Sequence, residues 1–307
     1  QTGPLCSVSG IKKRLQMTAS SSSRELMLEI PVLLRKLEPQ LIGRYDFFLL
    51  DQFGVLHDGT NPLPGAIEMV KMLRESGKKV VVTSNSSQRV NVAKRRWLEL
   101  GFPPVSDFIT SGEFAWHYLN MNYRGKKAII FGWRSQLGVE EYLKGTDIEI
   151  LSPQRVDEAD VLIFQGSETM GYQDISLKYT GQLDDEVVDV MTRAAEKGLL
   201  GVCANQDKKA CWAREEYYMP GMLEEAYRVR FGGETVFYGK PDYEFFTAAV
   251  SDRKIGQDLK ISASKSTKSG NCEEFLRDLS DKELEAKFGH YDDLRDDLDA
   301  QQRRRKW

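Results

Sequence analysis

The sequence of 307 residues lacks most of the features that would place it in a specialised class of protein. It has four cysteines and no Cys-x-x-Cys pair, so we predict neither a zinc site nor a disulfide framework, and expect a reduced intracellular compartment. No apolar run approaches the roughly 18 residues of a membrane span. The 43 basic and 46 acidic residues nearly cancel, which gives no electrostatic reason to expect nucleic acid or a membrane as the partner.

Both ends of the chain differ in composition from the middle. No acidic residue precedes Glu25, and residues 1–24 combine basic side chains with a serine run, as in a disordered leader or an organelle transit segment. Residues 251–307 hold 13 acidic and 13 basic side chains. We therefore expect a leader at 1–24 and a charged, partly helical tail at 263–307. The expected location is the cytoplasm, or a plastid or mitochondrion if the leader is a transit segment.

Between these ends, short apolar runs alternate with amphipathic segments. Continuous apolar strands that alternate with helices are typical of a parallel sheet covered on both faces, so we predict an α/β fold. Such sheets bind ligands at the carboxyl ends of their strands. The predicted strands are 47–50, 79–83, 128–131, 161–165, 199–204 and 235–238. The predicted helices are 64–76, 89–100, 113–120, 184–197, 222–231 and 243–250.

The first predicted strand ends at Asp51, shortly before Gly54. The glycine permits a sharp turn that would leave the carboxylate in the crevice at the end of the strand. A carboxylate there can act as a covalent nucleophile or as a magnesium ligand. Taken alone, the segment fits a turn or capping aspartate just as well.

Two later strand ends carry groups that can bind phosphate. Ser84 and Asn85 end the second predicted strand directly before a helix, and Lys240 follows the glycine after a later strand. Hydroxyl and amide groups at a helix start can donate to a phosphate, and a lysine can neutralise it. Each group is also common as a helix cap or a solvated side chain, so the ordered set is more informative than any one member.

The ordered set resembles the motifs of a known superfamily. The first stretch is Asp51-Gln52-Phe53-Gly54-Val55-Leu56 with Asp58-Gly59; Ser84-Asn85 and Gly239-Lys240-Pro241 follow. They resemble the first three motifs of the haloacid dehalogenase-like hydrolases. Three further stretches are similar to subfamily IIA: Thr110-Ser111-Gly112, Ala204-Asn205-Gln206-Asp207 and Pro220-Gly221-Met222. The resemblance covers about residues 41–250 and implies a doubly wound, Rossmann-like parallel sheet, in a group made up mostly of small-molecule phosphatases.

The spacing of the motifs indicates an inserted domain. The stretch from Ser84 to Lys240 is far too long for one step of a sheet. We expect a core at 25–109 and 219–262, and an inserted α/β domain at 110–218 that resembles the type 2 cap of subfamily IIA. Asn205 and Asp207 follow the last strand of this cap, where they would either contact the substrate or form an Asx turn.

The resemblance also implies a mechanism. Asp51 would attack phosphorus and form an aspartyl-phosphate, and Ser84 and Lys240 would neutralise the phosphate oxygens. Asn85 would contact the substrate, a small-molecule phosphate ester. Mg²⁺ would be held by Asp51 and by the main-chain carbonyl of Phe53.

Two departures from the superfamily pattern weaken the expected activity. Phe53 stands where active phosphatases of the superfamily usually carry a second aspartate, and such an acid/base contributes roughly 10²–10⁴-fold. The fourth motif, which supplies further carboxylates to the metal, has no counterpart in residues 260–268. The alternatives are therefore a catalytically inactive binding protein, or a hydrolase of C–halogen or C–P bonds.

Overall fold

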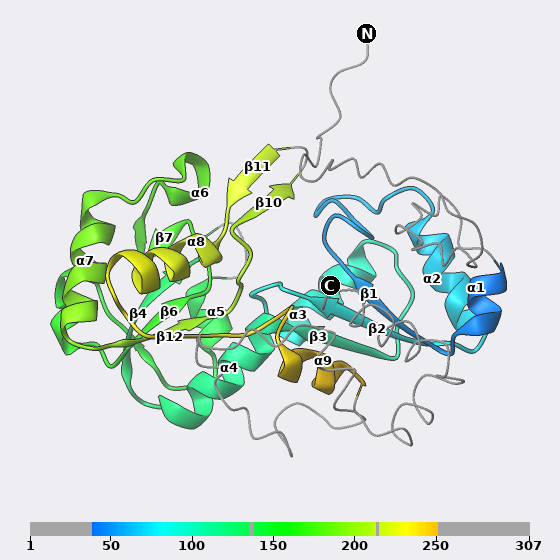
Figure 1. Ribbon diagram of the computed structural model, residues 1–307, viewed down its shortest axis with the longest axis horizontal. Coiled ribbons are helices and arrows are strands. Elements are labelled where there is room, and N and C mark those ends of the chain that lie inside the picture. Colours follow the sequence, from blue (N-terminus) through cyan, green and yellow to red (C-terminus); the bar gives the residue numbers. More distant parts are fainter. Residues whose placement is uncertain (1–38, 135–137, 213–214, 251–307) are drawn as a thin grey trace, which may run out of the picture.

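The computed structural model describes residues 39–134, 138–212 and 215–250, which form two α/β domains side by side (Figure 1). The first domain is built on a small parallel sheet and the second on a larger one. The expected leader at 1–24 and the expected tail at 263–307 lie outside the described residues. The predicted α/β fold with parallel strands is confirmed.

The sheet of the first domain has the order β1-β2-β3, with all its strands parallel. In this register Asp51 is level with Thr83 and Ser84 with Thr110, so the carboxyl ends of the strands meet at one edge. The strand β3 was not among the predicted strands. The bounds are β1 (Phe47–Asp51), β2 (Lys79–Ser84) and β3 (Asp107–Thr110).

Both faces of this sheet are covered, as the continuous apolar strands predict. Val82 packs on one face in a cluster with Trp97 of α3, while Val81 packs on the other face with Phe114 of α4 and Phe245 of α9. The helices around the sheet are α1 (Pro39–Arg44), α2 (Ala66–Glu75), α3 (Val90–Glu99), α4 (Ser111–Asn122) and α9 (Tyr243–Val250).

The sheet of the second domain has the order β12-β9-β6-β4-β7-β8, and β5 pairs with β4 beside this path. Its central strands β4, β6 and β9 are parallel and wholly apolar at their centres, whereas the short β7 and β8 are antiparallel additions. The strands are β4 (Lys127–Gly132), β5 (Glu149–Ile150), β6 (Val161–Phe164), β7 (Thr169–Met170), β8 (Gln173–Asp174), β9 (Leu200–Cys203) and β12 (Thr235–Phe237).

Helices cover the second sheet, and a separate two-stranded hairpin projects from it (Figure 1). The hairpin consists of β10 (Lys209–Trp212) and β11 (Glu215–Tyr218), which are antiparallel. The helices are α5 (Val139–Leu143), the 3₁₀ helix η1 (Pro153–Glu158), α6 (Leu177–Thr180), α7 (Asp185–Glu196), α8 (Pro220–Glu225) and the π-helical η2 (Ala226–Arg230).

The two domains share one hydrophobic cluster rather than meeting only through polar surfaces. It contains Val81 and Ile109 of the first sheet together with Ile130 and Ile163 of the second. Helix α4 leads from one sheet to the other and contributes Phe114 to the same cluster. This shared packing fixes how the edge of the first sheet faces the second domain.

The expected boundary of the core at residue 219 is wrong for the strand that precedes Lys240. Strand β12 pairs in parallel with β9, in the register Val236 to Val202, so it is part of the second sheet. Helix α8, which begins at Pro220, contributes Leu223 to the core beneath that sheet. The chain therefore returns to the first domain only at about Gly239. The other limits of the two domains remain predictions.

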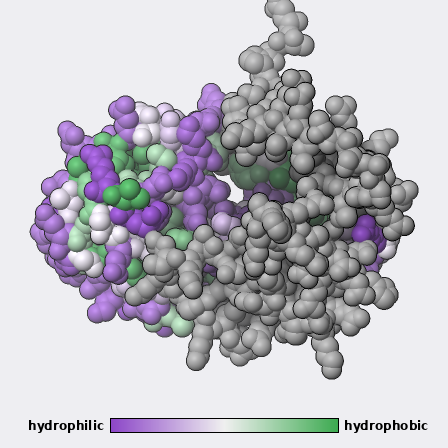
Figure 2. All heavy atoms as spheres, viewed as in Figure 1, coloured by the Kyte–Doolittle hydropathy of each residue, from purple (hydrophilic) through white to green (hydrophobic). Residues whose placement is uncertain are grey.

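The second domain exposes a mixed surface on the face shown in Figure 2. On the visible face, the placed atoms of the second domain are mainly hydrophilic, with hydrophobic atoms in small groups between them (Figure 2). None of the helices within the described ranges is both long and apolar enough to cross a bilayer.

Candidate active site

A cavity of about 650 Å³ lies where the carboxyl ends of β1 and β2 face the second domain. One wall comes from the loops after β1 and β2 and from α3, and the other from segments of the second domain, including the hairpin. All the residues that the sequence predicts for the site line this cavity: Asp51, Phe53, Ser84, Asn85, Asn205, Asp207 and Lys240.

The predicted nucleophile and the predicted lysine are in direct contact. Lys240 Nζ lies 2.5 Å from Asp51 Oδ1 and also donates to the carbonyl oxygen of Thr83 at 3.1 Å. Asp51 Oδ1 accepts a further bond from the main-chain N–H of Gln52 at 2.7 Å. The carboxylate is nearly half exposed, so a ligand can reach it beside an ammonium group that neutralises negative charge.

The loop after β1 turns sharply and shapes the floor of the cavity. Gly54 adopts a φ of 76°, a left-handed conformation that glycine adopts without strain. Its N–H donates to the carbonyl of His57 at 2.8 Å, and the Leu56 N–H donates to the carbonyl of Gln52 at 2.9 Å. The ring of Phe53 packs edge-on against His57, with ring centroids 5.2 Å apart. The position expected for a second acid is therefore apolar.

His57 is a buried, neutral imidazole in this loop. Burial and then the positive charge of Arg96 lower the pKa of His57 to about 4. Its Nδ1 accepts the N–H of Gly59 at 3.0 Å, so the remaining proton is on Nε2. Nε2 and the Oε1 atom of Gln52 are buried without a hydrogen-bond partner among the described residues, although both side chains line the cavity.

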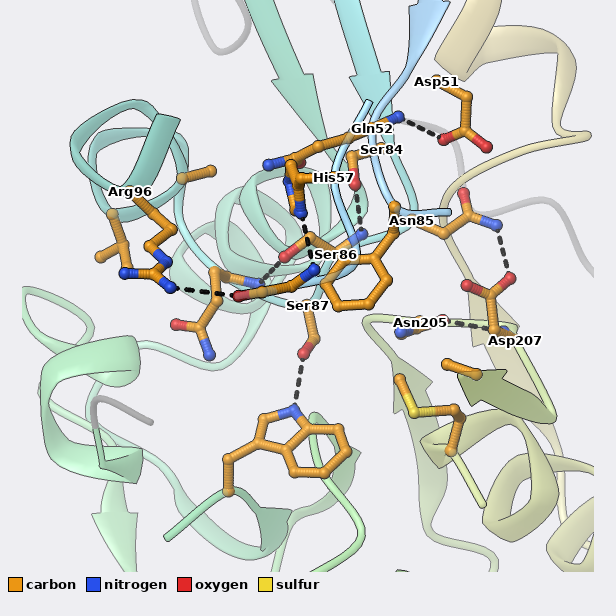
Figure 3. A pocket seen from close by; sticks show the side chains of 18 of the residues that line it. Asp51, Gln52, His57, Ser84, Asn85, Ser86, Ser87, Arg96, Asn205 and Asp207 are labelled. Atoms are coloured by element: carbon orange, nitrogen blue, oxygen red, sulfur yellow. Dashed lines mark hydrogen bonds between the residues drawn. The ribbon is translucent and has the colours of Figure 1, made fainter. Parts of the chain in front are cut away.

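The end of β2 supplies the hydroxyl groups that the motif predicts. Ser84 is buried, and its Oγ accepts the main-chain N–H of Ser86 at 3.2 Å. Ser87 accepts a bond from the indole N–H of Trp133, a residue of the second domain, at 2.9 Å. The hydroxyls of this loop thus line one side of the cavity, between Asp51 and α3 (Figure 3).

Asn85, predicted as a substrate contact, has all its amide groups engaged within the protein. Its Nδ2 donates to Asp207 Oδ1 at 3.0 Å and to the Lys240 carbonyl at 3.1 Å, and its Oδ1 accepts the Lys240 N–H at 2.7 Å. The neighbouring Gly239 has a φ of 119°, and a Cβ there would lie 2.6 Å from Asn85 Oδ1. In this structure Asn85 holds the lysine segment in place, so its predicted contact with substrate would require these bonds to open.

Asn205 and Asp207 form the Asx turn that the sequence left open as an alternative to substrate contact. Asn205 Oδ1 accepts the main-chain N–H of Asp207 at 2.8 Å (Figure 3). Burial raises the pKa of Asp207, while the bond from Asn85 and the charge of Lys240 act in the opposite direction. Both residues still line the cavity and stay candidates for substrate contact.

Several residues that line the cavity were missed in the sequence. Arg95 and Arg96 come from α3, and Trp133, Lys178 and Tyr217 come from the second domain. Lys178 forms an ion pair with the buried Glu168, and its Nζ lies 4.8 Å from the ring centroid of Tyr217. The only signal available for the arginines is their helical spacing with Val92 and Glu99, which resembles an ordinary solvated face.

These features define a class of protein. A carboxylate beside a lysine at the carboxyl ends of parallel strands, facing a second domain, is compatible with a hydrolase that uses a carboxylate nucleophile. The family model described as haloacid dehalogenase-like hydrolase matches residues 48–149. This match covers about a third of the chain, and it confirms the resemblance of the motifs to the haloacid dehalogenase-like hydrolases.

Individual relatives are similar over parts of the chain. The 4-nitrophenylphosphatase of Schizosaccharomyces pombe is 40% identical over 50 residues, which are 16% of this chain and 17% of the relative. Sugar-phosphatase AraL of Bacillus subtilis is 29% identical over 133 residues, 42% of this chain and 46% of the relative. The chain thus matches less than half the length of these curated relatives.

A solved structure supports the fold. The crystal structure of a haloacid dehalogenase-like hydrolase from Brucella suis 1330 superposes with a TM-score of 0.57 at 23% identity, covering 69% of this chain and 72% of that one. At this identity the similarity concerns the fold. The comparison therefore supports a two-domain α/β architecture in which the functional residues must be judged by their own geometry.

Proposed function

We propose that the chain is a Mg²⁺-dependent phosphatase of small phosphate esters that uses Asp51 as its nucleophile. The observation that carries this proposal is the contact of Asp51 with Lys240 at the carboxyl end of β1. The contact lies within a cavity that Ser84 also lines. The names of the two curated relatives, a nitrophenyl phosphatase and a sugar phosphatase, support the same reaction class.

The chemistry would proceed in two displacements at phosphorus. An oxygen of Asp51 forms a bond to phosphorus while the ester P–O bond breaks and the leaving group departs with the electron pair. Water then forms a P–O bond, the bond to Asp51 breaks, and inorganic phosphate leaves. Lys240 and the Ser84 hydroxyl stabilise the negative phosphate oxygens, so most of the acceleration comes from positioning and charge neutralisation.

Two oxygen ligands at the end of β1 are suited to a Mg²⁺ ion that is otherwise coordinated by water and substrate. Asp51 and the main-chain carbonyl of Phe53 would hold it, and Mg²⁺ commonly binds through one or two carboxylates together with water and substrate phosphate. Within the described ranges, no group of three or more His, Cys, Asp or Glu side chains is placed to hold a metal ion. When bound, the ion supplies charge neutralisation at the phosphate. The two protein oxygens predict weak affinity in the absence of substrate.

Phe53 limits which substrates such an enzyme would turn over well. A phenyl ring cannot protonate a leaving group, and the neighbouring His57 is neutral and buried. Esters whose leaving group departs readily without a proton, such as 4-nitrophenolate, should therefore react faster than alkyl phosphates.

The test is hydrolysis of 4-nitrophenyl phosphate by the full chain with Mg²⁺. The Asp51→Asn variant should lose at least about 10³-fold in kcat, because the amide is not a nucleophile. The matched control is Asp58→Asn, since Asp58 is on the same loop but its carboxylate bonds to the N–H groups of Thr60 and Asn61. Product release by wild type that equals that of Asp51→Asn would contradict the proposal and support an inactive binding protein.

A second candidate is favoured by Phe53 specifically. Displacement of halide from carbon by Asp51 needs no proton donor for the leaving group, so an aromatic residue at position 53 is no disadvantage there. Release of chloride from 2-chloropropionate that depends on Asp51 would support this reaction. A phosphatase would release phosphate from the nitrophenyl ester and no halide.

A further inference from the structure

One face of helix α3 forms the end of the cavity away from the nucleophile. Val92, Arg95, Arg96 and Glu99 all line the cavity and follow the i, i+3, i+4, i+7 spacing of a single helical stripe. The opposite side of the helix is anchored in the core by the buried Trp97. The stripe is therefore a fixed wall, and Figure 3 shows Arg96 on the opposite side of the pocket from Asp51.

The charge of this wall is positive. Arg95 makes no ion pair with any residue that the structure describes, and its helical neighbour Lys94 is directed to Asp107 instead, at 3.7 Å. Arg96 donates to the carbonyl of Gly59 at 3.1 Å and lies 3.5 Å from Glu99, its only carboxylate partner among the described residues. Two guanidinium groups thus face one carboxylate, so the wall has a surplus positive charge.

Lys178, which lines the cavity from the second domain, does not add to this surplus positive charge. Lys178 is paired with Glu168, which is only 8% exposed, and its Nζ lies 5.7 Å from the ring centroid of Trp133. The ion pair is neutral overall and held between aromatic rings. It can shape the cavity and donate hydrogen bonds, but the net attraction for an anion comes from α3.

We propose that Arg95 and Arg96 bind a second anionic group of the substrate, a carboxylate or a phosphate, on the side away from the phosphate that is cleaved. This inference rests on the proposed phosphatase function. Lys240 is engaged by Asp51, so it neutralises charge at the reacting end alone. Guanidinium groups bind carboxylate and phosphate through paired N–H donors, and charge in a cleft draws such ligands in. The substrate class is therefore a phosphate ester with two separate anionic groups.

The test compares two substrates of similar size, 3-phosphoglycerate and glycerol 3-phosphate, which differ mainly in whether a carboxylate is present. The wild type should have a kcat/KM at least about tenfold higher for 3-phosphoglycerate, because its carboxylate can accept charge-assisted hydrogen bonds that glycerol 3-phosphate cannot. Arg95→Gln should lower kcat/KM for 3-phosphoglycerate about five- to tenfold and change that for glycerol 3-phosphate less than about twofold. Arg96→Lys, which keeps the charge but loses the paired donors, should give a smaller loss with the same selectivity.

The matched control is Lys94→Gln, since Lys94 is a cation of the same helix that does not line the cavity. Lys94→Gln should leave kcat/KM unchanged for both 3-phosphoglycerate and glycerol 3-phosphate. Equal kcat/KM for the two substrates in wild type, or an equal loss on both in Arg95→Gln, would overturn the second anion site.

Binding measurements separate this inference from the phosphatase proposal. If neither substrate nor 4-nitrophenyl phosphate is hydrolysed, the phosphatase function fails. Calorimetric titration of the same protein with 3-phosphoglycerate and glycerol 3-phosphate decides the anion site whether or not either of them is hydrolysed. Tighter binding of 3-phosphoglycerate than of glycerol 3-phosphate, abolished by Arg95→Gln, supports it, and equal binding of the two overturns it.

Discussion

The indole N–H of Trp133 donates to the hydroxyl of Ser87 at 2.9 Å, and both side chains are buried. Trp133 follows β4 in the second domain, while Ser87 belongs to the loop between β2 and α3 in the first. The bond therefore joins the two domains directly at one wall of the cavity. The shared hydrophobic cluster supplies most of the packing between the two domains, and this hydrogen bond adds a polar contact between them.

Replacing Trp133 by phenylalanine should destabilise the protein by about 1–3 kcal/mol, because it removes packing volume and leaves the buried Ser87 hydroxyl without its donor. The free energy of unfolding from urea titration measures this, and KM for 4-nitrophenyl phosphate should rise as well. Trp116→Phe is the control, since the Trp116 indole nitrogen is buried without a partner among the described residues. A loss as large in the control would show that indole volume, rather than the hydrogen bond, is responsible.

Phe53→Asp should restore a proton donor beside the reacting phosphate. We expect kcat for an alkyl phosphate such as glycerol 3-phosphate to rise about tenfold or more, because general acid catalysis is worth roughly 10²–10⁴-fold. The rate with 4-nitrophenyl phosphate should change much less, since its leaving group needs no proton. Phe53→Asn is the matched control, and an equal rise in that variant would exclude an acid role for the new side chain.

Asn85→Ala should lower kcat about 10–100-fold with little change in KM, because Lys240 loses two of the bonds that hold its main chain while Asp51 stays in place. The reacting groups would then sample positions in which the ammonium no longer faces the carboxylate. Asn122→Ala, whose amide bonds to the Tyr118 carbonyl on the exposed face of α4, should leave kcat unchanged. An Asn85→Ala enzyme with normal kcat would contradict the positioning role.

Glu113 should make stability depend on pH. Burial tends to raise the pKa of Glu113, but the bonds from His117 and Arg89 and from the Val90 N–H outweigh it, and the pKa falls from 4.5 to about 2. A carboxyl whose pKa is lower in the folded state stabilises the fold above its unfolded pKa, and this contribution is lost as pH falls from about 4.5 towards 2.

The Glu113→Gln variant should therefore be less stable than wild type by about 2 kcal/mol above pH 5, and the difference should shrink below pH 4. Urea unfolding at a series of pH values measures it. Glu141→Gln removes an exposed carboxylate 3.7 Å from Lys144, and its effect should stay below about 0.5 kcal/mol at every pH. A constant difference across the pH range for Glu113→Gln would contradict the assigned charge.

The reacting end of the site was predictable because strand ends converge wherever parallel strands pair. Asp51 and Ser84 follow continuous apolar runs, and the register of β1 on β2 brings them to one edge. Lys240 reaches the same edge by another route, since β12 pairs with β9 of the second sheet and Gly239 redirects the chain. An apolar strand of three residues carries no information about which of two sheets it joins, so that assignment failed.

The stripe of α3 that forms the end of the cavity away from Asp51 was not predictable from the local sequence pattern. Arg95 and Arg96 lie on a polar helical stripe that looks the same whether it faces water or a neighbouring domain. Lys178 and Tyr217 belong to the second domain and line the same cavity as α3 only through the tertiary arrangement. Asn85 was recognised as a residue of the site, but its bonds to Asp207 and Lys240 depend on groups 122 and 155 residues away.

The contact between Asp51 and Lys240 spans 189 residues, and the second domain lies in the chain between them. During synthesis the aspartate emerges from the ribosome long before its ammonium partner, and domains fold as units as they emerge. The contact can therefore form only after the whole second domain has been synthesised. A nascent chain that has not yet released residue 240 carries the Asp51 carboxylate without its positively charged partner until the intervening domain has been made.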